Sequence, residues 1–424
     1  MTISIKRRTV LSGLAATAAT TLFAPSVRAA TPVRLGGLTT LEGPFATGGQ
    51  DAYRCMQMLL EEVGNQAGGR AIEWTRESSN AQADVALARA RKLIEQDNVD
   101  VILGPLSGAE GIALRDYSRT LTGRTIVNGS SGAADTTLRN PSPNFFRFNT
   151  DGTQWMAGLG NHVYKTMNIH DVAVTAGDYA FPYAQVFGFN IEFCRAGGRV
   201  THYWAPLGTT DFSAQVAQIN RSDAGAIVVV HGGTDGLAFM TQYAQAGGQK
   251  PLIAGSIMAD QTMLAARGPH RRVMIGMVSG GPIADVIDDP DWREFVERYR
   301  RRWLNEGGFP SPSIHAVNYV TNLWGILGAL RAVEGDLSND QAAFQRALAA
   351  QEFKAPTGAN VKLDHNRQAI SDIFLNRVEE RDGRAQVVAF GRAAQVNQTL
   401  GVPEAQFLAL GAPSRDNPGC VRPS

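Results

Sequence analysis

The sequence lacks the motifs that most enzymes and metalloproteins use for chemistry. It contains no C-x-x-C and no H-E-x-x-H, and its seven histidines are scattered over 424 residues. Closely spaced thiolates and imidazoles are what hold a zinc ion, so no zinc site is predicted. G-x-G-x-x-G and G-x-S-x-G, typical of dinucleotide-binding proteins and of α/β-hydrolases, are also absent. We therefore expect no catalytic residues, no cofactor and no metal.

An excess of charge of one sign is also lacking. The chain has 40 Lys and Arg against 39 Asp and Glu, a net charge of +1 that becomes −3 without residues 1–29. A near-neutral chain has no electrostatic footprint for nucleic acid. No run of about 18 apolar residues, the length of a membrane span, occurs in the sequence. We therefore expect a soluble mature chain that does not bind nucleic acid.

Cysteine is scarce. The three cysteines are Cys55, Cys194 and Cys420. In an oxidising compartment one pair of them could form a disulfide, which would leave one odd thiol. Cys55 and Cys194 lie in apolar stretches with helical spacing, and this context favours buried free thiols at both positions.

The first 29 residues have the pattern of an export signal. Basic residues are followed by a modest apolar run, and small residues precede a cleavage position after Ala29. The pair Arg7-Arg8 resembles a twin-arginine signal, although two flanking positions depart from the usual Ser and Phe. An ordinary secretion signal is the alternative. Either signal predicts export to the periplasm.

Beyond the signal, short β-branched runs alternate with longer helical patterns, and the alternation restarts halfway along the chain. This order predicts an α/β fold with parallel sheets covered by helices on both faces, in two similar halves. The expected strands are Val33–Leu38, Ile72–Thr75, Val99–Leu103 and Thr125–Val127 in the first half, and Val172–Val174, Val200–Trp204, Ala226–Val230 and Leu252–Ala254 in the second.

Loops rich in Gly, Ser and aromatics directly follow four of these strands. They are "GPLSGAEG", "NGSSGAAD", "TAGDYAFPYAQ" and "HGGTDG". Ligands of open α/β sheets bind beyond the carboxyl ends of the strands. Hydroxyl groups and free amides at helix starts suit a carboxylate without a buried lysine. A single Gly/Ser turn is usually only a turn, but four turns at equivalent places predict a ligand cleft.

Two further stretches bear on this cleft. "GPFATGGQ" has the glycine spacing of a P-loop, but Gly49 and Gln50 stand where Lys and Ser or Thr would hold phosphate and Mg²⁺. It therefore predicts no nucleotide site. "DYAFPY" places Tyr179, Phe181 and Tyr183 in one loop. Aromatic side chains in a turn are expected to close over a ligand, and packing between the halves is the alternative.

These loops resemble those of the periplasmic solute-binding proteins of the leucine/isoleucine/valine type, which serve ABC importers. The likeness covers nearly all of the mature chain through "GPFATGGQ", "VDVILGPLSG", "IVNGSSGAAD", "GDYAF", "LGTTDFSAQVAQINRSDAGAIVV" and "VKLDHNRQAI". It implies a type I periplasmic binding fold, in which two doubly wound parallel-sheet lobes are joined by a hinge of three crossings. The implied crossings lie near Phe148–Gly152, Met277–Gly281 and Leu363–Arg367. Lobe 1 would hold residues 30–148 and 277–364, and lobe 2 residues 149–276 and 365–424.

The resemblance also implies which residues bind the ligand. Family members hold the ligand carboxylate with two loops of lobe 1. At the matching positions here stand Ser107 with Gly108, and Ser130 with the hydroxyl of Ser131. The other contacts that we expect are Phe181 as an aromatic lid from lobe 2, Tyr179 beside it, Gly233 in lobe 2 and Phe45 in the first turn of lobe 1.

One position departs from the family pattern. Amino-acid binders of this family pair the α-ammonium with a lobe-2 acid, whose position falls at Ile257. Isoleucine cannot pair with a cation, and a buried unpaired ammonium costs several kcal/mol. Asp260 or Asp235 would substitute only after a shift in register. We therefore predict a carboxylate without the amine, such as an aromatic or short aliphatic acid, with an amino acid as the alternative.

The expected protein is thus an exported solute-binding protein and a monomer. It would capture a small carboxylate between closing lobes and deliver it to an inner-membrane ABC permease. One alternative is a periplasmic sensor module that presents its ligand to another chain. A periplasmic enzyme is a second alternative, which the missing motifs disfavour.

Overall fold

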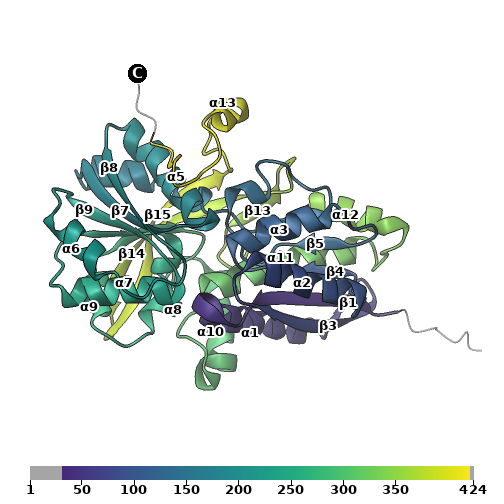
Figure 1. Cartoon of the computed structure of the whole chain (residues 1–424). Helices are drawn as coiled ribbons and strands as arrows, with labels where there is room; N and C mark the ends of the chain where they lie inside the picture. Colours follow the sequence, from purple (N-terminus) through teal and green to yellow (C-terminus); the bar gives the residue numbers. More distant parts are fainter. Residues whose placement is uncertain (1–30, 421–424) are drawn as a thin grey trace, which may run out of the picture.

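The structure, a computed structural model, describes residues 31–420, so the expected export signal in residues 1–29 lies outside the described part. Two groups of strands and helices lie side by side and are joined in the middle of the molecule (Figure 1). We call the elements around β1–β6 lobe 1 and those around β7–β11, β14 and β15 lobe 2. Within residues 31–420, no helix combines the length and apolar character that a membrane crossing requires.

Lobe 1 is built on a six-stranded sheet with the order β2-β3-β1-β4-β5-β6. β1, β3, β4, β5 and β6 pair in parallel. Parallel neighbours need a crossover, so the amphipathic segments between them form helices against the sheet. The elements are β1 (Val33–Thr40), α1 (Ala46–Glu62), β2 (Gln66–Ala67), β3 (Arg70–Ser79), α2 (Ala83–Glu95), β4 (Val101–Leu103), α3 (Gly108–Ser118), β5 (Thr125–Val127) and β6 (Phe145–Phe146).

Three later helices complete lobe 1. They are α10 (Pro290–Trp303), α11 (Ile314–Ala332) and α12 (Ala342–Ala349). α11 packs along α1 and is buried on nearly all sides. Tyr319 on α11 donates from its hydroxyl to the carbonyl of Leu38 in β1 at 2.7 Å. This contact fixes α11 beneath the sheet, where its first turn reaches the gap between the lobes.

Lobe 2 is built on a second sheet with the order β12-β13-β14-β11-β10-β9-β7-β8, and β15 pairs with β14. Its strands β7 to β11 are parallel, as expected, while β14 and β15 form a long antiparallel hairpin. The strands are β7 (Asp171–Gly177), β8 (Arg199–Ala205), β9 (Ala226–Val230), β10 (Leu252–Ala254), β11 (Val278–Gly281), β12 (Glu352–Lys354), β13 (Asn360–Leu363), β14 (Ala369–Arg381) and β15 (Arg384–Val396). The helices are α4 (Leu159–Asn161), α5 (Ala180–Arg195), α6 (Ser213–Arg221), α7 (Gly233–Gln245), α8 (Gln261–Leu264), α9 (His270–Met274) and α13 (Glu404–Ala409).

The chain passes between the two sheets more than once. It leaves the first sheet after β6 and enters the second at β7, and it returns from β11 to α10. Arg147, just after β6, forms a parallel bridge with Gln368, just before β14. The segments that connect the lobes are therefore paired with one another, which places them in one narrow zone.

A disulfide joins Cys194 on α5 to Cys420 near the end of the chain. The expectation of a free thiol at Cys194 is therefore wrong, whereas Cys55 is a buried free thiol as expected. The partners are 226 residues apart in sequence, so no local pattern could pair them. The segment before Cys420 is irregular and lies along α5, where the carbonyl of Pro418 accepts from the Asn190 side chain at 2.8 Å.

Candidate functional site

Loops from both lobes converge on one cavity between the sheets. It lies beyond the carboxyl ends of β4, β5, β7 and β10, where open α/β sheets bind their ligands. The space left between its walls is about 20 Å³, room for about one water molecule. The two walls therefore lie close together in this conformation, and a ligand would have to separate them. The lining residues are Phe45, Leu106, Ser107, Gly108, Ser130, Gly132, Trp155, Tyr179, Phe181, Ile257 and His315.

The start of α3 forms one part of the lobe-1 wall. Ser107 caps the helix: its hydroxyl accepts from the N–H of Glu110 at 3.5 Å, and the Glu110 carboxylate accepts from the Ser107 N–H at 2.9 Å. The Ser107 hydroxyl donates to the carbonyl of Ala81 at 3.1 Å. Gly108 follows as the first helical residue, whose N–H has no acceptor inside the helix. The Ser107 hydroxyl is already hydrogen-bonded to the chain. An anion bound here would therefore contact the free N–H groups at the start of α3.

The turn after β5 forms the second part of this wall. The N–H groups of Ser130 and Ser131 both donate to the carbonyl of Pro105, at 2.9 and 3.3 Å. The Ser131 hydroxyl is buried and faces α3, where a Cβ on Gly111 would stand 1.9 Å from it. Ser131 is therefore not among the lining residues, and Gly132 takes that place.

Ser130 joins the cavity to α11. Its Oγ lies 2.9 Å from Nδ1 of His315 and accepts from the side-chain amide of Asn318 at 3.0 Å. Burial lowers the pKa of His315 to about 4, so the imidazole is neutral at pH 7. In the tautomer with the proton on Nδ1, His315 donates to Ser130 and leaves the serine hydroxyl proton for a ligand oxygen.

Arg147 lies behind the turn after β5 and is fully buried. Its guanidinium donates to the carbonyl of Ala133 at 2.7 Å, to that of Ser131 at 3.3 Å and to the Thr137 hydroxyl at 2.5 Å. The C=O and N–H of a trans peptide point in opposite directions. Because Arg147 holds the carbonyl of Ser131, the N–H of Gly132 points away from the guanidinium. The arginine thereby sets the orientation of the turn that lines the cavity.

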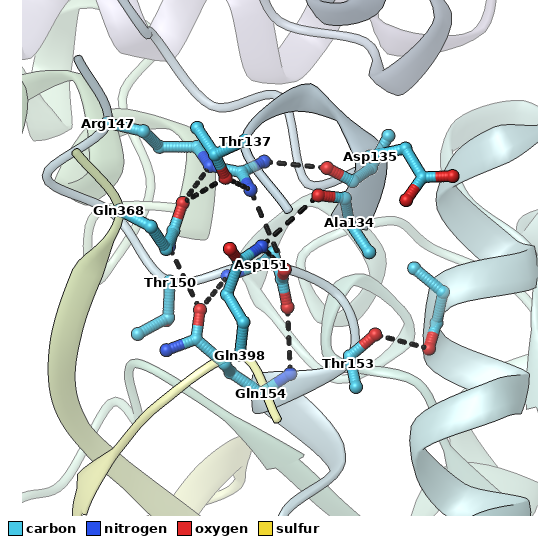
Figure 2. Close-up of polar contacts among 12 residues, drawn as sticks. Ala134, Asp135, Thr137, Arg147, Thr150, Asp151, Thr153, Gln154, Gln368 and Gln398 are labelled. Carbon is cyan, nitrogen blue, oxygen red and sulfur yellow. Dashed lines mark hydrogen bonds and ion pairs between the residues drawn. The ribbon is translucent and has the colours of Figure 1, made fainter. Parts of the chain in front are cut away.

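The arginine belongs to a network that continues into the segments between the lobes (Figure 2). Asp151 is also fully buried and lies 3.6 Å from the Arg147 guanidinium. Gln398 donates to Asp151 at 2.6 Å and to the carbonyl of Ala134 at 3.1 Å. Gln368 accepts from Arg147. Burial lowers the pKa of Arg147 to about 10, so it remains charged at pH 7. The turn and the connecting segments therefore form one hydrogen-bonded unit.

The second wall of the cavity consists of residues that follow the first connection between the lobes, and it is largely apolar. Phe181 packs edge-on against Trp155 with ring centroids 5.4 Å apart. A Cβ on Gly132 would stand 2.8 Å from the Phe181 ring, and one on Gly108 would stand 3.0 Å from the Phe181 Cβ. Phe181 thus reaches across to lobe 1 and rests on its two glycines. Ile257 completes this wall without a charge.

Gly233, predicted as a ligand contact, borders a neighbouring hollow that also touches Phe45, Ile257 and His315. Its φ of +55° favours glycine, and a Cβ there would stand 1.9 Å from the carbonyl oxygen of Pro44 in lobe 1. The lobes therefore touch at this point, and Gly233 lies at the rim of the cavity.

Neither predicted substitute acid lines the cavity. Asp235 accepts from the N–H of Gly208 at 2.7 Å within lobe 2. Asp260 caps α8 by accepting from the N–H of Thr262 at 2.9 Å, and it accepts from the N–H of Ile314 in α11 at 3.1 Å. Burial raises the pKa of Asp260 to about 6. Asp260 therefore links the lobes and is not placed to pair with a ligand cation.

Seven predicted residues line the cavity, and four lie outside its lining. The seven are Phe45, Ser107, Gly108, Ser130, Tyr179, Phe181 and Ile257, and the four are Ser131, Gly233, Asp235 and Asp260. Of the other four lining residues, Leu106 and Gly132 lie in the predicted loops, whereas the prediction missed His315 and Trp155. His315 begins a helix far along the chain, and Trp155 lies in a short 3-10 turn, so neither follows a predicted strand. The signal for His315 was a polar residue in the first turn of a largely apolar helix.

The sequence of this chain matches a known protein family and its members. The family model described as periplasmic binding protein matches residues 32–384. The chain is 25% identical over 367 residues to the Leu/Ile/Val-binding protein homolog 6 of Brucella melitensis, which covers 85% of this chain and 90% of that relative.

Two solved structures extend the comparison. An ABC transporter substrate-binding protein from Sphaerobacter thermophilus has a TM-score of 0.78 and 29% identity, covering 87% of this chain and 99% of that chain. A solute-binding protein of an ABC transporter from R. palustris, in complex with benzoate, has a TM-score of 0.78 and 22% identity, covering 86% and 97%.

Proposed function

Since the chain belongs to the periplasmic binding protein family, we propose that it is the solute-binding component of an ABC importer and captures a small carboxylate that lacks an α-amino group. The ligand would lie in the cavity between the lobes, with its carboxylate on the amides of Gly108 and Gly132 and on the Ser130 hydroxyl. Its apolar body would rest against Phe181 and Trp155.

One observation carries the amine-free assignment: the cavity lining contains no carboxylate side chain. Ile257 occupies the wall opposite the amide donors, and Asp260 is committed to amides of α8 and α11. A buried ammonium without an anionic partner costs several kcal/mol. A neutral or apolar group in the same place has no such cost. The benzoate found in the R. palustris protein fits this class of ligand.

A thermal-shift screen tests the proposal. The chain without residues 1–29 would be freed of co-purified ligand by unfolding and refolding, then screened with α-amino acids and with amine-free aromatic and aliphatic acids. A ligand at about 100 times its Kd adds roughly 2.7 kcal/mol to the free energy of unfolding, a shift of a few degrees. We expect shifts with amine-free acids. Shifts with amino acids alone would contradict the assignment.

We further propose that the twin-arginine route carries the protein to the periplasm, where an inner-membrane permease receives the ligand. The pair Arg7-Arg8 supports the route. Replacing both arginines by lysine should leave the precursor in the cytoplasm, as cell fractionation would show. Unchanged export of that variant would favour the ordinary secretion signal instead.

A further inference from the structure

The hydroxyl of Tyr179 is a polar atom on the apolar wall of the cavity. It is buried and has no hydrogen-bond partner within residues 31–420, although the side chain lines the cavity. Burial, with a smaller contribution from the charge of Asp235, raises the pKa of Tyr179. The phenol is therefore protonated at neutral pH and can both donate and accept a hydrogen bond.

Two other polar groups near this wall have partners. The indole N–H of Trp155 donates to the Thr150 hydroxyl at 2.8 Å. Tyr183, four residues after Tyr179 in the same loop and helix, donates to Asp178. Buried hydroxyls in proteins nearly always have a partner, and an unpaired one in a binding cavity is an unmet recognition element. Among the residues that line the cavity, Tyr179 is the one with a buried side-chain polar atom that has no hydrogen-bond partner within residues 31–420.

Resting on the function proposed above, we propose that Tyr179 recognises a second, uncharged oxygen of the ligand at the end opposite its carboxylate. The carboxylate would occupy the amide donors of lobe 1, so the far end of the ligand reaches the wall that holds Tyr179. The carboxylate of Asp235 disfavours a second anionic group there, because like charges repel. Phe45, Phe181 and Trp155 line the space between the two ends. The ligand class is thus an aromatic acid with a ring hydroxyl or another neutral oxygen.

Calorimetric titration of the ligand-stripped chain with benzoate, 3-hydroxybenzoate and 4-hydroxybenzoate tests this role. We expect one of the hydroxylated acids to bind about tenfold or more tightly than benzoate, as for a buried donor that gains its partner. Tyr179→Phe should lose the preference for the hydroxylated acid over benzoate.

Tyr183→Phe is the matched control, because its hydroxyl bonds to Asp178 and the residue is not part of the lining. This variant should keep the wild-type preference. A preference that survives in Tyr179→Phe, or a wild-type protein that binds benzoate best, would overturn the role of Tyr179 and leave the proposed function standing. Failure of all three acids to bind either protein would overturn the assignment to aromatic acids and this inference with it.

Discussion

The two walls of the cavity are built from different chemistry. The lobe-1 wall consists of helix amides, the turn after β5 and the Ser130–His315 pair, and buried side chains hold it from behind. The opposite wall consists of Trp155, Phe181, Ile257 and Tyr179, with one unpaired hydroxyl. A polar wall that is already ordered can hold a carboxylate at little cost in reorganisation. Under the proposed function, the apolar wall would select the carbon skeleton and the second polar group of the bound acid.

Removal of Arg147 should have the largest effect, because it breaks the support of the polar wall. Arg147→Met leaves Asp151 buried without its cation, and breaking a buried pair in this way costs about 3–5 kcal/mol. Urea unfolding of the variant should show a loss of this size. Arg293→Met, which removes an exposed partner of Asp288, should stay within about 0.5 kcal/mol of the wild type. Equal losses in both variants would show that the buried network does not support the wall.

The contact between the walls is tested at Gly132. A Cβ there would lie 2.8 Å from the Phe181 ring, so Gly132→Ala must push the aromatic wall away from the amides. Overpacking of this kind costs about 1–3 kcal/mol, and we expect it as a roughly 10- to 100-fold loss in affinity for an aromatic acid, measured by calorimetry.

Gly225→Ala is a suitable control, since the nearest atom to its Cβ would be 3.4 Å away and the residue lies outside the cavity lining. Its affinity should equal that of the wild type. If Gly132→Ala also bound normally, the closed contact between the walls would not be the binding conformation.

An acidic side chain on the apolar wall should reduce the chemical difference between the two walls of the cavity. Ile257→Glu adds a carboxylate opposite the amide donors, where it repels a second anion and can pair with an ammonium. We expect the ratio of affinities for amine-free acids over α-amino acids to fall about tenfold or more. Ile257→Gln, similar in size and uncharged, should change this ratio much less. An unchanged ratio in the glutamate variant would remove Ile257 from the account of specificity.

The smallest expected effect concerns the link between the lobes at Asp260. Its pKa is raised by burial from 3.8 to about 6, so the folded protein binds more protons than the unfolded chain between these values. The contribution of Asp260 to the free energy of unfolding therefore falls as pH rises from about 4 to 6. Above pH 6 the buried carboxylate is charged, and its full destabilising effect on the folded state remains. Asp260→Asn should gain stability relative to the wild type over this window, as urea unfolding of both proteins at pH 4 and pH 6 would show. Parallel curves for the two proteins would contradict the raised pKa.

Local patterns in the sequence accounted for much of the fold. The runs Val101–Leu103 and Ala226–Val230 are strands whose residues are all buried, and a continuous apolar run bounded by turns signals such strands without tertiary information. The β14–β15 hairpin was not predicted, although Asp382-Gly383, the two residues between its strands, is a strong local signal for a tight hairpin turn. The disulfide between Cys194 and Cys420 carries no local signal, because its partners are 226 residues apart.

The cavity was predictable in part. Residues directly after parallel strands, such as Ser107 and Phe181, follow from topology. The orientation of a serine hydroxyl does not follow from topology. The Ser131 hydroxyl points toward α3, where Gly111 has no side chain to exclude it. His315 comes from α11, a helix of lobe 1 that begins more than 180 residues after Ser130 and is held against β1 by Tyr319. Sequence patterns carry no information about such long-range placement.

The most direct test of the central claim compares ligands that differ only in the amine. Calorimetric titration of the ligand-stripped wild-type chain with 3-phenylpropanoate and L-phenylalanine, and with 4-methylpentanoate and L-leucine, holds the carbon skeleton constant within each pair. With no acid in the cavity lining, the amine-free member of the pair that binds should be tighter by about tenfold or more. Tighter binding of the amino acid in either pair would mean that an acidic side chain of the protein reaches the ligand ammonium. That result would contradict the proposed preference for amine-free acids.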